Sequence, residues 1–265
     1  MANETESASF LLSREELLLL LDLLEAESIP GLDPDPLGEL NDDQRALALI
    51  WAGRALRARE LAAVGENGEL LVDEGLLTAV GGCIYWQTAL YVYHWPEPGR
   101  APIRFFGYAR DGQAVTHTRP ADVLHHLAVL PSAEALADEV TAVCQCQTLP
   151  DAPDTQFTLP RDLFIRAREL AEEQEMAAAA QTLQEAGVPG ETAQTLTAVL
   201  SGAPRMSIWQ IVKRGENGDA ETHDYTLLHS EDAAWLVSLP AGGDDLEVRT
   251  VTAVALRELL AGASG

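Results

Sequence analysis

The first apolar pattern along the chain has the period of a helix. Four leucines recur at helical spacing and predict a stripe that packs into the interior: Leu17, Leu20, Leu21 and Leu24. Ser13 precedes this stripe and Glu16 stands three residues after Ser13, which is the spacing of a capping box. We therefore expect the first helix to begin at Ser13.

Prolines and glycines between residues 28 and 43 end that helix, and Asp42 or Asp43 is predicted to begin a second one. The second helix carries a set of apolar residues: Leu47, Ile50, Trp51, Ala55 and Leu61. The segment Gly65–Gly68 predicts a turn, and Asp73 is predicted to cap a third helix.

The period then changes to that of a strand. Residues from Ile84 to Trp95 are β-branched and aromatic, and both faces of the predicted strand are apolar, so each face should be covered. Asp111-Gly112 is a strong two-residue hairpin signal between strands at 104–109 and 114–118. Pro120 is predicted to open a helix that carries three leucines: Leu124, Leu127 and Leu130. Ser132 is predicted to cap the next helix.

The order of elements restarts at Phe157, where "FTLPRDLFIRAREL" parallels "FLLSREELLLLLDLL" from Phe10. The dipeptide Trp-Gln occurs twice, and we expect Trp86 and Trp209 on corresponding strands. The segment "TAVALRELLAGA" near the end parallels "RPADVLHHLAVL". We therefore predict an α+β fold of two similar halves, each with helices, an antiparallel sheet and a closing helix, related by an approximate twofold axis. Two α+β subdomains that are alike by chance are the alternative. The predicted boundaries are a first half at 1–147, a linker at 148–156 and a second half at 157–265.

Composition limits the possible partners. The formal net charge is -25, so the chain should repel nucleic acids and anionic lipids, which are bound through Lys and Arg. We find no run of 18 apolar residues and no secretory signal pattern at the start. The chain has three cysteines, too few and odd in number for a disulfide framework, so we expect a cytoplasmic protein.

Three candidate sites of chemistry have simpler explanations. His125, His126, Cys144 and Cys146 lack the paired short spacings of a zinc site, so we expect neither a metal nor a cofactor. The acidic segment 33–44 matches a calcium loop only in part, because Leu37 takes a ligand position and Gln44 replaces the bidentate glutamate. Cys83, which follows two glycines at the expected start of a strand, is more typical of an inert buried thiol than of a nucleophile.

The chain resembles the EspG family, cytosolic chaperones associated with type VII secretion. The resemblance rests on the leucine-rich first helix, on "LRARELAAVGENGELLVDEGLLTAV" from Leu56 to Val80, and on the repeated order after Phe157. The acidic loop at Asp33–Asp43 and the segment Cys144–Gln156 depart from the family pattern. The resemblance implies a quasi-twofold α/β body, no catalytic residue, and binding of a secreted helical protein pair whose apolar tip is kept from aggregating.

We predict four partner-binding residues on strands of the second half: Tyr225, Leu227, Trp235 and Val237. Acidic neighbours such as Glu231 and Asp232 would form a polar rim around this apolar centre. The alternative is that the four side chains pack beneath the terminal helices. Two other functions also stay open, an enzyme with a dispersed site and a scaffold or immunity-type inhibitor.

Overall fold

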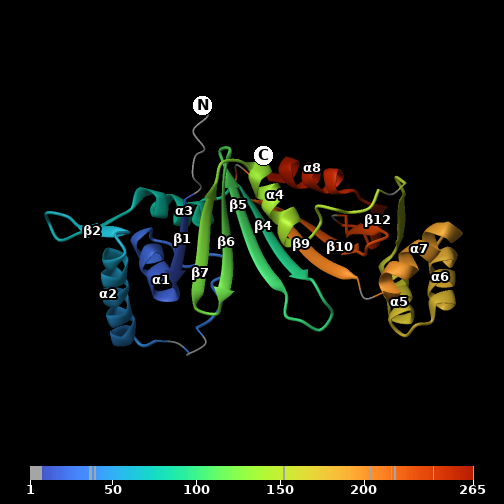
Figure 1. The fold of residues 1–265 in the computed structure, drawn as a ribbon, viewed down its shortest axis with the longest axis horizontal. Helices are drawn as coiled ribbons and strands as arrows, with labels where there is room; N and C mark the ends of the chain where they lie inside the picture. The colour runs from blue at the N-terminus through green and yellow to red at the C-terminus, as the bar shows by residue number, and fades with distance from the viewer. Residues whose placement is uncertain are drawn as a thin grey trace. The chain divides into compact units, whose positions relative to one another are not determined.

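The computed structural model describes residues 8–35, 38, 40–151, 153–202, 204–215, 217, 219–240 and 242–264 (Figure 1). It confirms the predicted α+β class. The chain forms two compact units: unit 1 comprises Met1–Ala89, Arg104–Leu136 and Ser264–Gly265, and unit 2 comprises Leu90–Ile103 and Ala137–Ala263. In the part of the chain that the structure describes, no helix has the length and apolarity needed to cross a membrane.

Unit 1 contains an antiparallel sheet with the strand order β1-β7-β6-β5. The bounds are Ser9–Ser13 for β1, Ile103–Arg110 for β5, Gln113–Ala121 for β6 and Leu124–Leu130 for β7. Asp111 and Gly112 join β5 to β6 with φ angles of 51° and 78°. Positive φ at both central residues is the geometry of a type I′ hairpin turn, so this sequence prediction is confirmed.

The helices of unit 1 also begin where the sequence predicts. They are α1 (Arg14–Leu23), α2 (Asp42–Ala58) and α3 (Glu74–Ile84), with a small hairpin of β2 (Ala62–Val64) and β3 (Leu70–Val72) between α2 and α3. Ser13 Oγ accepts from the Glu16 N–H at 3.2 Å and Glu16 Oε2 accepts from the Ser13 N–H at 2.8 Å, which completes the capping box. Asn41 and Gln44 form a second capping box at the start of α2.

The predicted helix at Pro120–Leu130 is wrong, because these residues form the end of β6 and all of β7. The β6–β7 pairing shifts register between Thr118 and Ala121, and β7 then pairs with β6 on one side and β1 on the other. Leucines three residues apart fit a helix, but His125 and Leu127 are both buried, at the two-residue spacing of one strand face. Strand pairing on both sides satisfies the backbone, and this outweighs the local helical pattern.

Unit 2 contains a sheet with the strand order β4-β9-β10-β11-β12-β8. The bounds are Thr88–Trp95 for β4, Gln156–Pro160 for β8, Arg205–Arg214 for β9, Ala220–His229 for β10, Ala234–Ser238 for β11 and Asp245–Thr250 for β12. Three helices pack on the sheet through one apolar core: α5 (Arg161–Glu172), α6 (Met176–Glu185) and α7 (Gly190–Ser201). The remaining helices are α4 (Ala133–Val143) and α8 (Ala253–Ser264), joined by the Arg257–Asp138 ion pair at 2.5 Å.

The order of elements along the chain is repeated, as predicted. Each series runs strand, three helices, four strands and a helix, with the β2–β3 hairpin added to the first. The opening strand pairs with the last strand of its own series in both cases, β1 with β7 and β8 with β12. The correct counterpart of α8 is therefore α4, not the segment near Pro120. The predicted domain boundaries stay a prediction.

Trp86 and Trp209 do not occupy corresponding places, so that prediction is wrong. Helix α3 continues through Gly81 and Gly82 to Ile84, and Trp86 lies in the turn before β4. Trp209 is the fifth residue of β9. The Trp-Gln dipeptide therefore arises in two different local structures.

Candidate partner-binding surface

One face of the sheet in unit 2 carries a row of aromatic side chains. Along β4, Leu90, Val92 and His94 are buried, and the alternate residues Tyr91, Tyr93 and Trp95 are only half-buried. The Tyr93 and Trp95 rings stack with centroids 6.5 Å apart. Alternation along a strand thus leaves three aromatic rings partly accessible on one side.

The neighbouring strand β9 extends this surface. His94 Nδ1 lies 2.9 Å from Ser207 Oγ, and both residues are buried, so their side chains share one face of the sheet. Met206 and Ile208 therefore lie on the other face, and Ile208 is 39% exposed. We call the set Tyr91, Tyr93, Trp95, Met206 and Ile208 the aromatic face.

A groove of about 450 Å³ adjoins the aromatic face. Trp95, Met206 and Leu228 form part of its apolar lining, together with Leu200 of α7. At its margin Arg168 donates to Glu172 across one turn of α5, at 2.7 Å. An apolar centre of aromatic and methionine side chains with a charged margin is the usual composition of a protein-binding surface.

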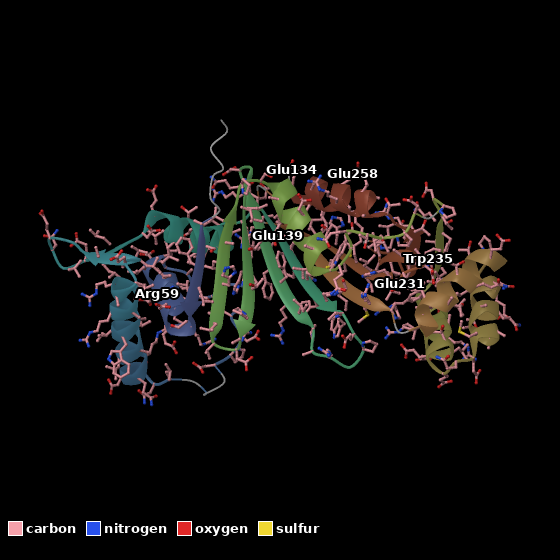
Figure 2. The ribbon with its side chains drawn as sticks, viewed as in Figure 1. Arg59, Glu134, Glu139, Glu231, Trp235 and Glu258 are labelled. Carbon is pink, nitrogen blue, oxygen red and sulfur yellow. The ribbon has the colours of Figure 1, made fainter. Side chains whose placement is uncertain are left out.

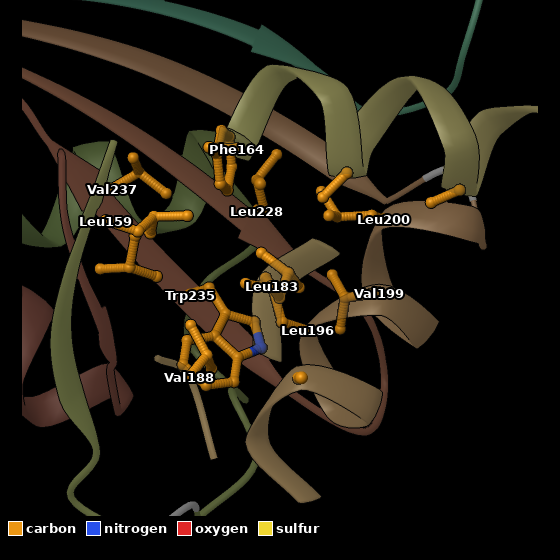
Figure 3. Packing of buried hydrophobic residues seen from close by; sticks show 14 of the residues in the cluster. Leu159, Phe164, Leu183, Val188, Leu196, Val199, Leu200, Leu228, Trp235 and Val237 are labelled. Carbon is orange, nitrogen blue, oxygen red and sulfur yellow. The ribbon is translucent and has the colours of Figure 1, made fainter. Parts of the chain in front are cut away.

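Two of the predicted partner-binding residues, Trp235 and Val237, lie in the interior of unit 2. Trp235 is 1% exposed and packs among residues of α6, α7 and the loop between them, including Leu183, Val188 and Leu196 (Figure 3). The Phe157 ring meets the Trp235 ring edge to face at 6.0 Å. This placement agrees with the alternative in which these side chains pack beneath helices.

Tyr225 and Leu227 lie on the opposite face of the same sheet. Trp235 pairs with Leu228 and Val237 pairs with Thr226, so the side chains of Tyr225 and Leu227, one residue along, point the other way. Leu227 is buried and Tyr225 is half-buried. The four residues therefore do not form one surface, and the structure does not bring them together. A partner-binding role for them stays a prediction.

Two residues of the predicted acidic rim, Glu231 and Asp232, are exposed. Both lie in the turn between β10 and β11, and Figure 2 labels Glu231 and Trp235. Because Trp235 itself is buried, this rim surrounds no accessible apolar centre at that position.

The cysteines are buried thiols. Cys83 lies inside α3 rather than at the start of a strand, and it is 1% exposed. Burial raises the pKa of the Cys83 thiol far above its ordinary value, which disfavours the nucleophilic thiolate. Cys144 and Cys146 are fully buried in unit 2, where the Cys144 carbonyl lies 3.2 Å from His229 Nε2. None of the three is accessible to a substrate in this structure.

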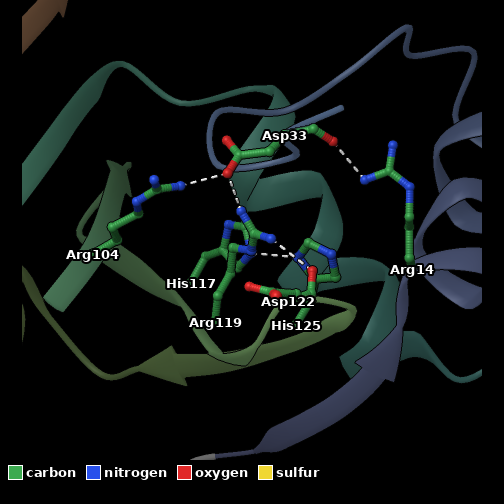
Figure 4. Close-up of polar contacts among 7 residues, drawn as sticks. All are labelled: Arg14, Asp33, Arg104, His117, Arg119, Asp122 and His125. Carbon is green, nitrogen blue, oxygen red and sulfur yellow. Dashed lines mark hydrogen bonds and ion pairs between the residues drawn. The ribbon is translucent and has the colours of Figure 1, made fainter. Parts of the chain in front are cut away.

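The acidic segment after α1 is held by arginines (Figure 4). Arg104 and Arg119 both donate to Asp33 Oδ2, and Arg14 donates to the Asp33 carbonyl at 2.6 Å. Arg14 also pairs with Asp35 at 3.3 Å. Burial opposes ionisation of the Asp33 carboxyl, but the hydrogen bonds from Arg119 and Arg104 outweigh it and lower the pKa of Asp33. Asp33 and Asp35, which stand at two ligand positions of the partial calcium-loop match, are thus held by arginines within unit 1. Leu37 lies outside the described residues.

Two histidines form a buried pair next to Asp33. His117 Nε2 lies 2.9 Å from His125 Nδ1, so one ring donates an N–H to the other (Figure 4). Burial, and then the neighbouring His125, lower the pKa of His117 to about 3. Burial, and then Arg119, lower the pKa of His125 to about 4. Both rings are neutral at pH 7 and serve the interior of unit 1 rather than an accessible site.

Sequence reasoning missed the aromatic face as a binding surface. It recognised the row at Tyr91, Tyr93 and Trp95 but expected it to be covered, because both faces of the strand are apolar. A usable signal was the turn "PEPG" directly after Trp95, which shows that the last aromatic residue lies at a strand end.

This chain is similar to known proteins in its sequence and in its fold. A model of the EspG family matches residues 13–249 of the chain. The fold is similar to that of the Mycobacterium tuberculosis type VII secretion system chaperone EspG5, solved in complex with the PE25-PPE41 dimer. That similarity has a TM-score of 0.66 at 11% identity, and covers 97% of this chain and 95% of the other. No curated protein sequence matches the chain.

Proposed function

Because the chain belongs to the EspG family, we propose that it is a non-catalytic chaperone of type VII secretion. In this proposal it binds a secreted helical protein pair in the cytoplasm and keeps the apolar tip of that pair soluble. The observation that supports the proposal most is the family match over residues 13–249, together with the fold shared with EspG5 over nearly the full length of both chains.

The aromatic face and the groove are the surface we assign to the partner. Trp95 belongs to both, and aromatic residues are the commonest anchors of protein interfaces. Met206 also belongs to both, and its flexible thioether can adapt to differently shaped apolar partners. A helical tip that exposes apolar side chains would bury them here, away from water.

The chemistry of the titratable groups supports a non-catalytic role. The histidines whose pKa values are most strongly lowered, His117, His125 and His229, have buried rings. The carboxylate that lines the groove, Glu172, is paired with Arg168. A general base needs access to its substrate, and these groups lack it or are already paired.

The proposal is tested by co-expression with a candidate pair of small helical secreted proteins, sought first among the genes that neighbour this one. The soluble fraction of the pair and its co-elution with this chain on size exclusion are measured. We expect the pair to aggregate alone and to co-elute with the wild-type chain. Trp95→Ala and Ile208→Asp should each weaken capture at least about tenfold, the effect of losing an interface anchor.

Tyr85→Ala is the matched control, because Tyr85 is an aromatic residue of unit 1 that is 48% exposed and lies outside the aromatic face. It should leave capture unchanged. If the neighbouring pair is fully soluble alone and does not bind this chain, the chaperone function is wrong. If binding occurs but Trp95→Ala and Tyr85→Ala behave alike, only the assignment of the surface is wrong.

A further inference from the structure

Helix α2 has two apolar faces, and only one of them is covered. Ala52 and Leu56 are buried toward α1. On the opposite side, Leu47, Ile50 and Trp51 are 49%, 54% and 61% exposed. The three fall within about a third of a turn of one another around the helix, so they form a single stripe. Figure 1 shows α1 along one side of α2 and, among the described residues of unit 1, no helix or strand along the other.

A groove of about 410 Å³ runs beside this stripe. Small side chains of α2, Ala48, Ala52 and Ala55, form part of its lining, and Leu40 and Ser13 contribute from outside the helix. The short alanine side chains thus leave an open space beside the exposed Trp51 ring. We call the stripe and this groove together the α2 face.

The charges at the two ends of the stripe have opposite signs. Asp43 lies on the stripe near the start of α2 and Arg54 lies on it near the end, about 16 Å apart at 1.5 Å per residue. Both residues are exposed, and neither takes part in an ion pair with any residue that the structure describes. A helix that packs along the stripe with complementary charges carries a positive charge opposite Asp43 and a negative charge opposite Arg54, which is the order of the stripe reversed.

A second copy of α2 in antiparallel orientation has this reverse order. The midpoint between Asp43 and Arg54 falls between Ala48 and Leu49, and so does the midpoint between Leu47 and Ile50. A twofold axis at that point places Asp43 opposite Arg54 of the second copy. It also places Leu47 opposite Ile50, so charges and apolar side chains match in one register.

The same axis brings each tryptophan to the other copy's groove. Trp51 and the groove lie on the same side of the stripe, and a twofold axis keeps that side common to both copies. The Trp51 ring of one copy then meets the groove of the other near Gln44 and Ala48. Such mutual insertion is the self-complementarity that an isologous interface requires.

We propose that the α2 face is a self-association surface that pairs two copies of this chain through antiparallel α2 helices. One helix per copy gives an interface at the small end of the known range, below about 1,200 Å². The net charge of -25 on each copy also opposes association. We therefore expect a reversible dimer with a dissociation constant on the order of 10–100 µM.

Sedimentation equilibrium of the full chain from about 1 to about 200 µM, without a secreted partner, tests the proposal. Trp51→Glu should raise the dissociation constant at least about tenfold. Val254→Glu is the matched control, because Val254 is a 66% exposed apolar residue on a different helix, α8, and it should leave the constant unchanged.

Charge variants test the antiparallel register. Asp43→Arg and Arg54→Asp should each weaken self-association, because each homodimer then brings like charges together twice. An equimolar mixture of the two variants should form a heterodimer, since both contacts become attractive. A wild-type chain that stays monomeric at the highest concentration overturns the proposal, as does a mixture that associates no better than its components. If the wild-type chain is monomeric and Trp51→Glu loses capture of a secreted partner, the α2 face belongs to that partner instead.

Discussion

Replacement of Trp235 by alanine should strongly destabilise this protein. The indole ring is 1% exposed and lies in the core shared by β11 and the helices α5, α6 and α7 (Figure 3). Removing it leaves a cavity lined by side chains on several elements, which cannot all move inward. Large-to-small changes of this kind cost about 3–5 kcal/mol.

Two features place the expected loss in the upper part of that range. The edge-to-face contact with Phe157 at 6.0 Å adds an aromatic interaction, which is worth about 0.5–1.5 kcal/mol. The second is the number of elements involved, since Leu183 of α6 and Leu196 of α7 both lose a partner. With about 2–4 °C per kcal/mol for a chain of this size, the melting temperature should fall by roughly 10 °C or more.

Urea unfolding followed by far-ultraviolet circular dichroism measures this change. Trp235→Phe is the first control: it keeps most of the ring volume and removes an indole N–H for which no acceptor is found among the described residues, so it should cost only about 1 kcal/mol. Trp51→Ala is the second, because Trp51 is 61% exposed and its removal should change stability by about 0.5 kcal/mol or less. If Trp235→Ala unfolds at the wild-type urea concentration and loses only partner capture, Trp235 belongs to an interface and our core assignment is wrong.

Three further predictions concern pH, an ion-pair network and metal. Burial lowers the pKa values of His117, His125 and His229 from 6.5 to about 3, about 4 and about 4. The stabilising contribution of these neutral rings is therefore complete above pH 6.5 and is lost as the pH falls toward 4. The urea midpoint should decrease when the pH is lowered from 7 to 5, and a flat profile would contradict the burial of these rings. Asp33→Asn should cost about 1–3 kcal/mol in urea unfolding because Arg119 loses a charged acceptor, and no change would show that the network adds nothing. A strong chelator should leave the melting temperature unchanged, whereas a large drop would reveal a structural metal.

Local signals in the sequence were enough to place many elements. The Ser13–Glu16 capping box and the Asp111-Gly112 turn are satisfied by backbone groups within a few residues, so their geometry hardly depends on the rest of the fold. The repeated order of helices and strands was also visible, because each element carries its own apolar period. The resemblance to the EspG family also rested on this order of elements, and the family match over residues 13–249 confirms it.

Features that depend on strand pairing could not be predicted in this way. Leu124, Leu127 and Leu130 suit a helix, and only the pairing of β7 with two neighbours makes that segment a strand. A shift of one residue in register reverses every side chain of a strand. For that reason the sequence could not show that Tyr225 points away from the face that carries Trp235.

The candidate surfaces were decided by tertiary structure for a related reason. The sequence alone determined that Trp51, Trp95 and Trp235 lie in apolar segments with helix or strand periods. It could not determine which of them the other elements cover. Packing buries Trp235 beneath three helices, leaves Trp95 half-buried at a groove, and leaves Trp51 exposed on α2. Exposure depends on residues distant in the chain, and a period along the chain contains no information about them.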